Sequence, residues 1–266
     1  MFSVASRRSK KEAVIGLTFV VTRFARLHFL VFLLIINWVC NSYATSNLDW
    51  RLIPNQPDVR VALFTGTFDP PHRAHLQIVK DVIQQRLADF VIMLPNEQAL
   101  HKPNASPFLL RYEMTKALFR DFDRVAIPSV EDFDPSRYSH QFLDLFSKTH
   151  NQVQIFAVMG SDVAAQAHDI FETNIHWMGL AQVFLVHLRD GVDQGLSREI
   201  KGRRVIPFSS FQGKLSSTGL RNLVRNGNED LLLLNQYTDP EVVRIIRRNH
   251  LYQTQNSLCS KVFDPK

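Results

Sequence analysis

The stretch FTGTFDPPHRAHL, residues 64–76, lies between an apolar run and the start of an amphipathic pattern. The apolar run VRVALF, residues 59–64, predicts a buried strand, and AHLQIVKDVIQQRLA, residues 74–88, predicts an amphipathic helix. Gly66 follows the strand directly, where the missing side chain lets the backbone approach a ligand closely. The stretch therefore predicts a strand, a loop stiffened by two prolines, and a helix that begins near Arg73.

The start of this helix offers a place for an anion. Its first N–H groups have no partner inside the helix and lie at the positive end of the helix dipole, so they attract phosphate. His72 and His75 can share one face of the helix and donate hydrogen bonds to an anion there. A zinc site would need a third ligand, and a chance surface pair is less in keeping with the complete run GTFDPPHRAH after a strand. We expect a phosphate site without a metal held by the protein.

Strands and helices alternate along the rest of the chain. Strands are expected at residues 90–95, 124–130, 153–160, 181–188 and 204–208, and helices at 107–120, 139–150, 216–227 and 239–252. This alternation predicts an α/β fold with a doubly wound, mostly parallel sheet, helices on both faces and a C-terminal helical segment. Such sheets bind ligands outside the carboxyl ends of their strands, where the strand order reverses. The long loops at 96–106 and 189–203 are expected to be functional.

A second polar group occurs late in the chain, in LSSTGLRNLVRNG, residues 215–227. Three hydroxyl residues stand where a helix would begin, and an arginine follows one turn later; they are Ser216, Ser217, Thr218 and Arg221. Hydroxyl groups at a helix start can cap it or bind phosphate oxygens, and arginine adds a charge-assisted fork. Taken alone, this group is typical of a plain helix cap. Taken together with the first stretch, it favours phosphate binding.

The two stretches together resemble the nucleotidylyltransferase superfamily, which has a (T/H)xGH-type element after the first strand and an SSTxIR-type element late in the chain. Within it, the sequence is most similar to the nicotinate or nicotinamide mononucleotide adenylyltransferases. The likeness rests on GTFDPPH, His101-Lys102, Gly160-Ser161-Asp162 and the C-terminal VVRIIRRNHLY, and covers roughly residues 59–252. It departs from the family at Ala74, which replaces a glycine, and at RYSHQFL, residues 137–143, which matches the family's SYT.DTL only loosely.

The resemblance implies a Rossmann-like enzyme of NAD biosynthesis that joins ATP to nicotinate or nicotinamide mononucleotide and releases pyrophosphate. It implies that His72 and His75 contact the ATP phosphates, and that Arg221 holds the β and γ groups together with Ser217 and Thr218. Magnesium would arrive on the triphosphate, with no dedicated protein site. The overall likeness to the compact bacterial-type enzymes implies that the nicotinate form is preferred. A site built for one ring substituent should reject the other, because it leaves a polar group unpaired.

The resemblance implies further contacts with the two nucleotides. Asp162 would bind the adenosine ribose and Lys102 the phosphate of the acceptor. Trp177 is either the aromatic that stacks on the pyridine ring or a packing residue on a helix. The other implied nucleotide-binding positions are Gly66, Thr67, Phe68, Gly160 and Ser216. Alternatives are a pantetheine-phosphate adenylyltransferase, a cytidylyltransferase, or a non-catalytic nucleotide-binding protein or membrane-tethered scaffold of this fold.

The composition is that of a globular protein, with 266 residues, 45% apolar and 21% charged. Residues 1–50 carry +4 of the formal net charge of +6, so the body is nearly neutral and indicates no nucleic-acid partner. Cys40 and Cys259 lie near opposite ends and form no disulfide framework, which fits a reducing compartment. The oligomeric state is left open.

The beginning of the chain reads differently from the rest. LHFLVFLLIINWVC, residues 27–40, is almost wholly apolar and follows basic residues. Three interpretations stay open for residues 1–48: a signal-like leader, an anchor, or an over-extended start. Residues 13–44 are the only segment that could contact a membrane, and the catalytic domain is expected in the cytoplasm, where ATP is present. We expect a nucleotidylyltransferase domain over residues 57–253 and a tail over 254–266.

Overall fold

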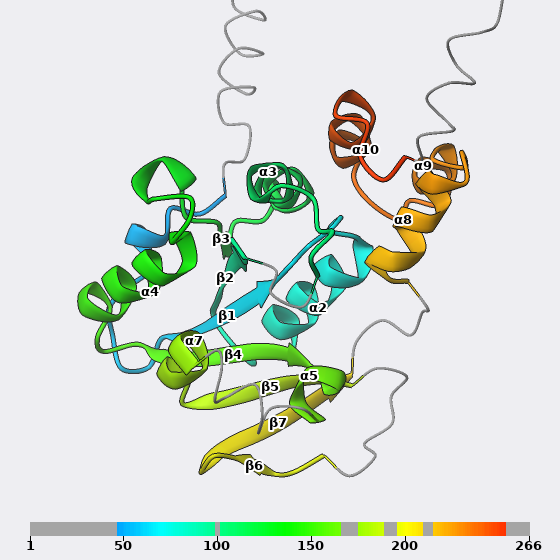
Figure 1. Ribbon diagram of the computed structural model, residues 1–266. Coiled ribbons are helices and arrows are strands. Elements are labelled where there is room, and N and C mark those ends of the chain that lie inside the picture. The colour runs from blue at the N-terminus through cyan, green and yellow to red at the C-terminus, as the bar shows by residue number, and fades with distance from the viewer. Residues whose placement is uncertain (1–46, 99–101, 166–174, 189–195, 210–214, 254–266) are drawn as a thin grey trace, which may run out of the picture. The chain divides into compact units, whose positions relative to one another are not determined.

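The computed structural model describes residues 47–98, 102–165, 175–188, 196–209 and 215–253 (Figure 1). Residues 13–44, the only segment that could contact a membrane, lie outside the described residues, as do His101 and the expected tail at 254–266. In the described part of the chain, no helix combines the length and the apolar character that crossing a membrane requires.

Seven strands form one sheet in the order β3-β2-β1-β4-β5-β7-β6. The strands are β1 (Arg60–Gly66), β2 (Phe90–Pro95), β3 (Val125–Ala126), β4 (Gln154–Gly160), β5 (Val183–Leu188), β6 (Glu199–Ile200) and β7 (Arg203–Ser209). All neighbouring strands are parallel except β6 and β7. The mostly parallel sheet is therefore confirmed, and the antiparallel β6 lies within a segment that was expected to be a loop.

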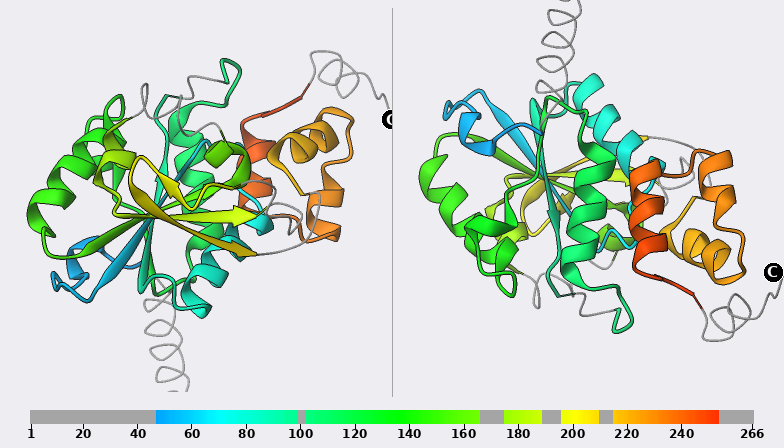
Figure 2. Two further views of the ribbon diagram at one scale, coloured as in Figure 1. Left: turned by 90° about the horizontal axis from the view of Figure 1, so that it is seen from below. Right: turned by 90° about the horizontal axis from the view of Figure 1, so that it is seen from above.

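The helices connect these strands and cover the sheet. They are α2 (Arg73–Gln84), α3 (Phe108–Phe119), α4 (Tyr138–Thr149), α5 (Ser161–Ala165), α7 (Ile175–Leu180), α8 (Ser217–Arg225), α9 (Asp230–Leu234) and α10 (Pro240–Arg248), with short 3-10 turns η1 (Trp50–Leu52) and η2 (Val130–Asp132). Figure 2 shows helices on both faces of the sheet, and α8, α9 and α10 grouped at one side. This arrangement confirms the expected C-terminal helical segment; α9 was not predicted.

The order of the strands reverses at β1. From β1 the chain proceeds to β2 and β3 on one side and then returns to β4 on the other. In the register of the sheet, Phe64 lies opposite Met93 of β2 and Val158 of β4. Gly66 and Gly160 each lie two residues beyond that pair, so they end at the same edge of the sheet. The two glycines therefore lie at the carboxyl ends of β1 and β4, where the strand order reverses and a ligand site was expected.

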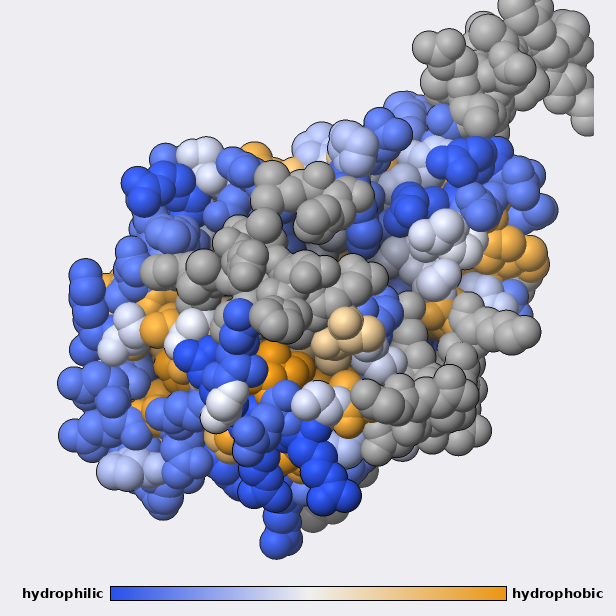
Figure 3. All heavy atoms as spheres, turned by 60° about the horizontal axis from the view of Figure 1, so that its bottom comes forward, coloured by the Kyte–Doolittle hydropathy of each residue, from blue (hydrophilic) through white to orange (hydrophobic). Residues whose placement is uncertain are grey.

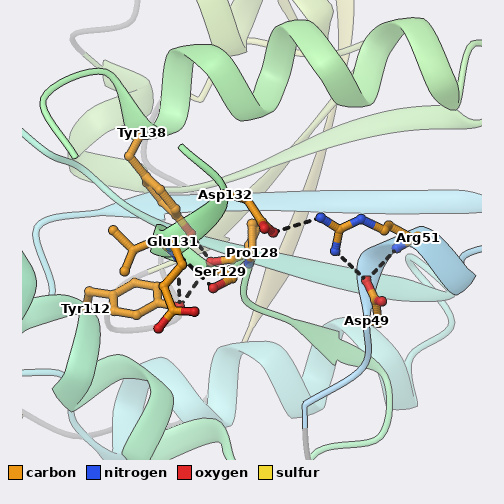
Figure 4. Close-up of polar contacts among 9 residues, drawn as sticks. Asp49, Arg51, Tyr112, Pro128, Ser129, Glu131, Asp132 and Tyr138 are labelled. Carbon is orange, nitrogen blue, oxygen red and sulfur yellow. Dashed lines mark hydrogen bonds and ion pairs between the residues drawn. The ribbon is translucent and has the colours of Figure 1, made fainter. Parts of the chain in front are cut away.

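The strand expected at 124–130 was predicted too long, since β3 contains only Val125 and Ala126. Pro128 lacks the N–H that a continuing strand would need, and its carbonyl accepts hydrogen bonds from two tyrosines instead. Tyr138 donates from its hydroxyl at 2.7 Å and Tyr112 at 3.2 Å, as Figure 4 shows. Side chains thus satisfy the backbone here, and the chain turns away from the sheet.

The segment before β1 packs into the same fold. The N–H of Leu48 donates to the carbonyl of Val125 at 3.0 Å. Trp50 is 4% exposed, and its ring lies edge-on to Phe142 of α4 with 5.3 Å between the ring centroids. Arg51, the following residue in the chain, donates hydrogen bonds to the carboxylates of Asp49 and Asp132, as Figure 4 shows. The packed part of the chain thus begins before residue 57.

The buried core consists mainly of apolar side chains from the strands and from the faces of the helices turned toward them. On the face drawn in Figure 3, hydrophilic residues cover most of the described surface, with smaller hydrophobic areas between them. Such scattered apolar surface is normal for a globular protein and needs no partner to explain it.

Candidate functional site

The loop after β1 is shaped by a close contact between Gly66 and Phe68. A Cβ atom on Gly66 would lie 2.9 Å from the ring of Phe68, so a larger residue would displace that ring. Phe68 has φ +48° and is 3% exposed, with its ring packed edge-on against Phe64 and His75. The side chain of Phe68 therefore supports the loop from the inside, and the backbone of Thr67 and Gly66 forms the part that a ligand could meet.

The two histidines share one face of the start of α2, as expected. His72 is the residue before the helix and is 4% exposed, whereas His75 is half-buried. Their rings are stacked with 3.8 Å between centroids. The Nδ1 atom of His75 accepts a hydrogen bond from the backbone N–H of His72 at 3.2 Å. In the neutral ring of His75 the proton is then on Nε2, the nitrogen that can donate to an anion.

The second polar group lies directly against the first, although 147 residues separate Ser217 from Pro70. The hydroxyl of Ser217 donates to the carbonyl of Pro70 at 2.9 Å. Arg221 donates to the carbonyl of Asp69 at 2.6 Å and to the hydroxyl of Thr218 at 3.0 Å. The start of α8 thus places one guanidinium and two hydroxyl groups beside the start of α2.

Ser216 has a different place from its neighbours. It is the residue before α8, and its hydroxyl accepts the backbone N–H of Gly219 at 3.1 Å. This contact is an N-cap, which supplies one of the helix N–H groups with a partner. The structure therefore shows for Ser216 the capping role that the sequence left open.

The C-terminal segment holds the same loop from a third direction. Thr238 donates to the carbonyl of Pro71 at 2.9 Å, and the hydroxyl of Tyr252 donates to the carboxylate of Asp69 at 2.5 Å. Burial, together with the negative charge of Asp69, raises the pKa of Tyr252 well above its usual range. Tyr252 therefore stays a neutral donor, and the carboxylate of Asp69 stays fixed.

Three further predicted residues follow the carboxyl ends of β2 and β4. Gly160 is the last residue of β4, Asp162 is exposed in the first turn of α5, and Lys102 is exposed in the loop after β2. Because parallel strands end at one edge, these residues belong to the same edge as Gly66. Within the described ranges, no three His, Cys, Asp or Glu side chains are grouped so that they could hold a metal ion.

Trp177 is not brought to this edge by what the structure describes. Its backbone belongs to α7, which leads into the amino end of β5. Gln182, two residues after α7, donates its N–H to Ile155 near the amino end of β4 at 2.8 Å. The side chain of Trp177 lies outside the described part.

Sequence reasoning missed Arg111, which reaches the loop from α3. Arg111 is 2% exposed and donates to the carbonyl of Thr67 at 2.8 Å. The signal in PFLLRYEMTKALFR, residues 107–120, was that Arg111 stands between the apolar residues Leu110 and Tyr112 in a helix that is apolar on several sides. A charge at a buried position of a helix is a candidate for a specific polar task.

Known proteins resemble this chain both in sequence and in fold. A "Probable nicotinate-nucleotide adenylyltransferase" of Clostridium botulinum (strain Okra / Type B1) is 25% identical over 211 residues, which are 73% of this chain and 100% of the relative. One with the same description from Clostridium kluyveri is 24% identical over 213 residues, with the same coverage.

Solved structures agree with this fold. Plasmodium falciparum nicotinic acid mononucleotide adenylyltransferase complexed with NaAD has a TM-score of 0.55 and 17% identity, and covers 73% of this chain and 97% of its own. The same enzyme complexed with APC has a TM-score of 0.53 and 16% identity. These likenesses confirm the Rossmann-like nucleotidylyltransferase fold.

The family comparison covers the first polar stretch, the whole region between the two stretches, and the second stretch as far as residue 222. The model of the family described as "Cytidylyltransferase-like" matches residues 63–222. This range runs from the middle of β1 through Arg221, so it contains the loop, both histidines and the start of α8. The resemblance to the nucleotidylyltransferase superfamily is thereby confirmed: the chain belongs to the cytidylyltransferase-like family.

Proposed function

We propose that this protein transfers the adenylyl group of ATP to nicotinate mononucleotide, giving the dinucleotide and pyrophosphate for NAD biosynthesis. The observation that carries the proposal is that Ser217 and Arg221 of α8 hold the carbonyls of Pro70 and Asp69, in the loop that leads from β1 to the histidines of α2. The strand order reverses at β1. Relatives that match over 73% of this chain are described as nicotinate-nucleotide adenylyltransferases, which supports the choice of acceptor.

The reaction needs positioning and charge neutralisation more than covalent help. A phosphate oxygen of the acceptor attacks the α-phosphorus of ATP, and the bond from that phosphorus to the pyrophosphate oxygen breaks on the opposite side. Negative charge grows on the leaving pyrophosphate, so nearby cations and N–H donors stabilise the transition state. The start of α2 contributes His72, His75 and helix N–H groups, and the start of α8 contributes Arg221, Ser217 and Thr218.

The acceptor nucleotide would bind on the side of β2, and the adenosine of ATP on the side of β4. Lys102, after β2, would hold the phosphate of the acceptor, and Asp162, after β4, would accept hydrogen bonds from the adenosine ribose. Gly66 and Gly160 end the neighbouring strands β1 and β4, and the joined phosphates would pass over these two strand ends. Magnesium would arrive with the substrate as MgATP and would supply charge neutralisation at the phosphates. A substrate of this kind supports a cytoplasmic catalytic domain, because ATP is present there.

The test is an assay of pyrophosphate release with MgATP and separate acceptors. We expect activity with nicotinate mononucleotide and at least about tenfold lower catalytic efficiency with nicotinamide mononucleotide, because the mismatched ring substituent leaves a polar group unpaired. A ratio near one, or one that favours the amide, would contradict the preference. Inactivity with both pyridine nucleotides but activity with phosphopantetheine, or with CTP and another acceptor, would replace the proposal with another member of the superfamily.

A further inference from the structure

Arg111 is a charged residue that is buried near the start of a helix, where a positive charge is unfavourable. It is 2% exposed and stands in the first turn of α3, close to the positive end of the helix dipole. Burial lowers its pKa from the usual range, partly offset by the charge of Asp69. A buried cation at a helix start lowers stability unless its hydrogen bonds are well formed. The hydrogen bonds that Arg111 donates therefore indicate what it contributes to the structure.

Each of the three nitrogen atoms of the guanidinium reaches a different residue. Nη1 donates to the carbonyl of Thr67 at 2.8 Å, Nε to that of Ser106 at 2.8 Å, and Nη2 to that of Glu97 at 3.3 Å. Thr67 belongs to the loop after β1, which carries the residues proposed for ATP. Glu97 and Ser106 lie before and after Lys102 in the loop after β2. One planar group thus holds both the loop after β1 and the loop after β2, and Thr67 lies 44 positions before Arg111 in the chain.

Asp69, in the loop after β1, makes a second contact between the two loops. Its carboxylate accepts the N–H of Ser106 at 3.1 Å, while Arg111 holds the carbonyl of the same residue. Both polar groups of the Ser106 backbone are therefore fixed, one by the loop after β1 and one by α3. The position of the loop that bears Lys102 is set relative to the loop that begins α2.

We infer that Arg111 is a positioning residue that sets the distance between the ATP side and the acceptor side of the site. The inference rests on the proposed function, since it assigns these two loops to the two substrates. Arg111 itself touches neither substrate in this arrangement and acts through the carbonyls of Thr67, Glu97 and Ser106. In-line transfer is sensitive to such spacing, because a misplacement of about 1 Å can lower a rate by about 100-fold.

Two substitutions separate the charge of Arg111 from its shape. Arg111→Lys keeps a cation but replaces the planar fork by a single ammonium, which cannot reach three carbonyls in the same directions. Arg111→Met removes the charge and leaves a flexible apolar side chain. The matched control is Arg120→Met at the other end of α3, where an exposed arginine bridges to Asp239 through two hydrogen bonds and lies outside the proposed site.

The experiment measures kcat per folded enzyme, melting temperature, and the Kd of MgATP and of nicotinate mononucleotide, each bound alone. We expect both Arg111 variants to lose about 30- to 100-fold in kcat while each separate Kd stays within about threefold. The Arg120→Met control should keep its kcat within about twofold. A merely structural role would lower the folded fraction and the melting temperature but leave the kcat of the folded enzyme unchanged.

The outcomes distinguish this inference from the proposed function. If the full-length protein is active and Arg111→Lys has normal kcat per folded enzyme, the positioning role is wrong and the proposed function stands. A loss confined to the Kd of one substrate would also overturn the role, because it would make Arg111 part of one binding site. If the unaltered protein transfers no adenylyl group to any of the acceptors, the proposed function fails, and the assignment of the loops fails with it.

Discussion

His75 combines a structural contact and a proposed chemical one in a single side chain. Its Nδ1 atom accepts the N–H of His72, which satisfies one of the N–H groups at the start of α2. The same contact leaves the proton of the neutral ring on Nε2, which can donate to a phosphate oxygen. The two nitrogen atoms can therefore be tested separately, since different substitutions keep one and remove the other.

His75→Asn keeps an acceptor near the position of Nδ1 but removes the Nε2 donor, whereas His75→Ala removes both. We expect both variants to lower kcat by about 100- to 1000-fold, the usual effect of removing one donor to developing charge. Only His75→Ala should also lose about 1 kcal/mol of stability, by loss of the contact at the helix start. Steady-state kinetics and denaturant unfolding of the two variants measure these effects. Near-normal catalytic efficiency in His75→Asn would remove His75 from the phosphate site.

At the level of elements, the two adjacent serines at the start of α8, Ser216 and Ser217, make different contacts. Ser216 caps the helix by accepting the N–H of Gly219, and Ser217 reaches across to the carbonyl of Pro70. The cap satisfies the helix itself, while the second contact joins α8 to the loop before α2. Substitutions at the two positions should therefore change different measured quantities.

Ser216→Ala should lower the free energy of unfolding by about 1 kcal/mol, and Ser216→Gly by only a few tenths, because glycine tolerates the cap conformation. Neither should raise the KM for ATP by more than about threefold, since the contribution of a cap is to stability. Ser217→Ala serves as the comparison: we expect it to raise that KM more than either variant of Ser216. Equal effects of Ser216→Ala and Ser217→Ala on KM would show that Ser216 also binds the nucleotide.

In the molecule as a whole, the segment just before β1 belongs to the folded core. Trp50 and Ile53 are 4% and 3% exposed, and both pack against the buried cluster that includes α4. Nucleotide-binding candidates begin only at Gly66. The stability of the domain and the chemistry of its site therefore depend on different parts of the first 70 residues.

Two truncations test this separation. Deleting residues 1–47 should leave both adenylyl transfer and melting temperature unchanged, because every proposed contact lies beyond this range. Deleting residues 1–53 also removes Trp50 and Ile53, and the loss of a buried tryptophan alone costs about 3 to 5 kcal/mol. Thermal unfolding and the adenylyl-transfer assay on both truncated proteins measure the difference. Equal melting temperatures would show that the segment before β1 contributes nothing to the core.

Local sequence patterns were sufficient for most of the elements. Continuous apolar runs predicted β1, β2, β4 and β5, because strands buried on both faces need apolar residues at nearly every position. β7 was predicted from the shorter run RVIPF, although only part of this strand is buried. The helix at 74–88 was predicted too long: α2 ends at Gln84, and Arg86 takes φ +55°, which a helix does not allow. β3 and α9 are too short to show a clear period in the sequence. The end of β3 depends on neighbours, namely the two tyrosines that donate to the carbonyl of Pro128.

The amino-acid sequence alone contained the residue types of the site and the places where helices begin. It showed the glycine after β1, the paired histidines and the Ser-Ser-Thr before an arginine, because each is a local pattern within about one helical turn. It could not show that Arg221 donates to Asp69, that Tyr252 holds the same aspartate, or that Arg111 joins two loops. These contacts link residues far apart in the chain. Such residues come within hydrogen-bond distance only when the sheet has formed and the helices have packed on it.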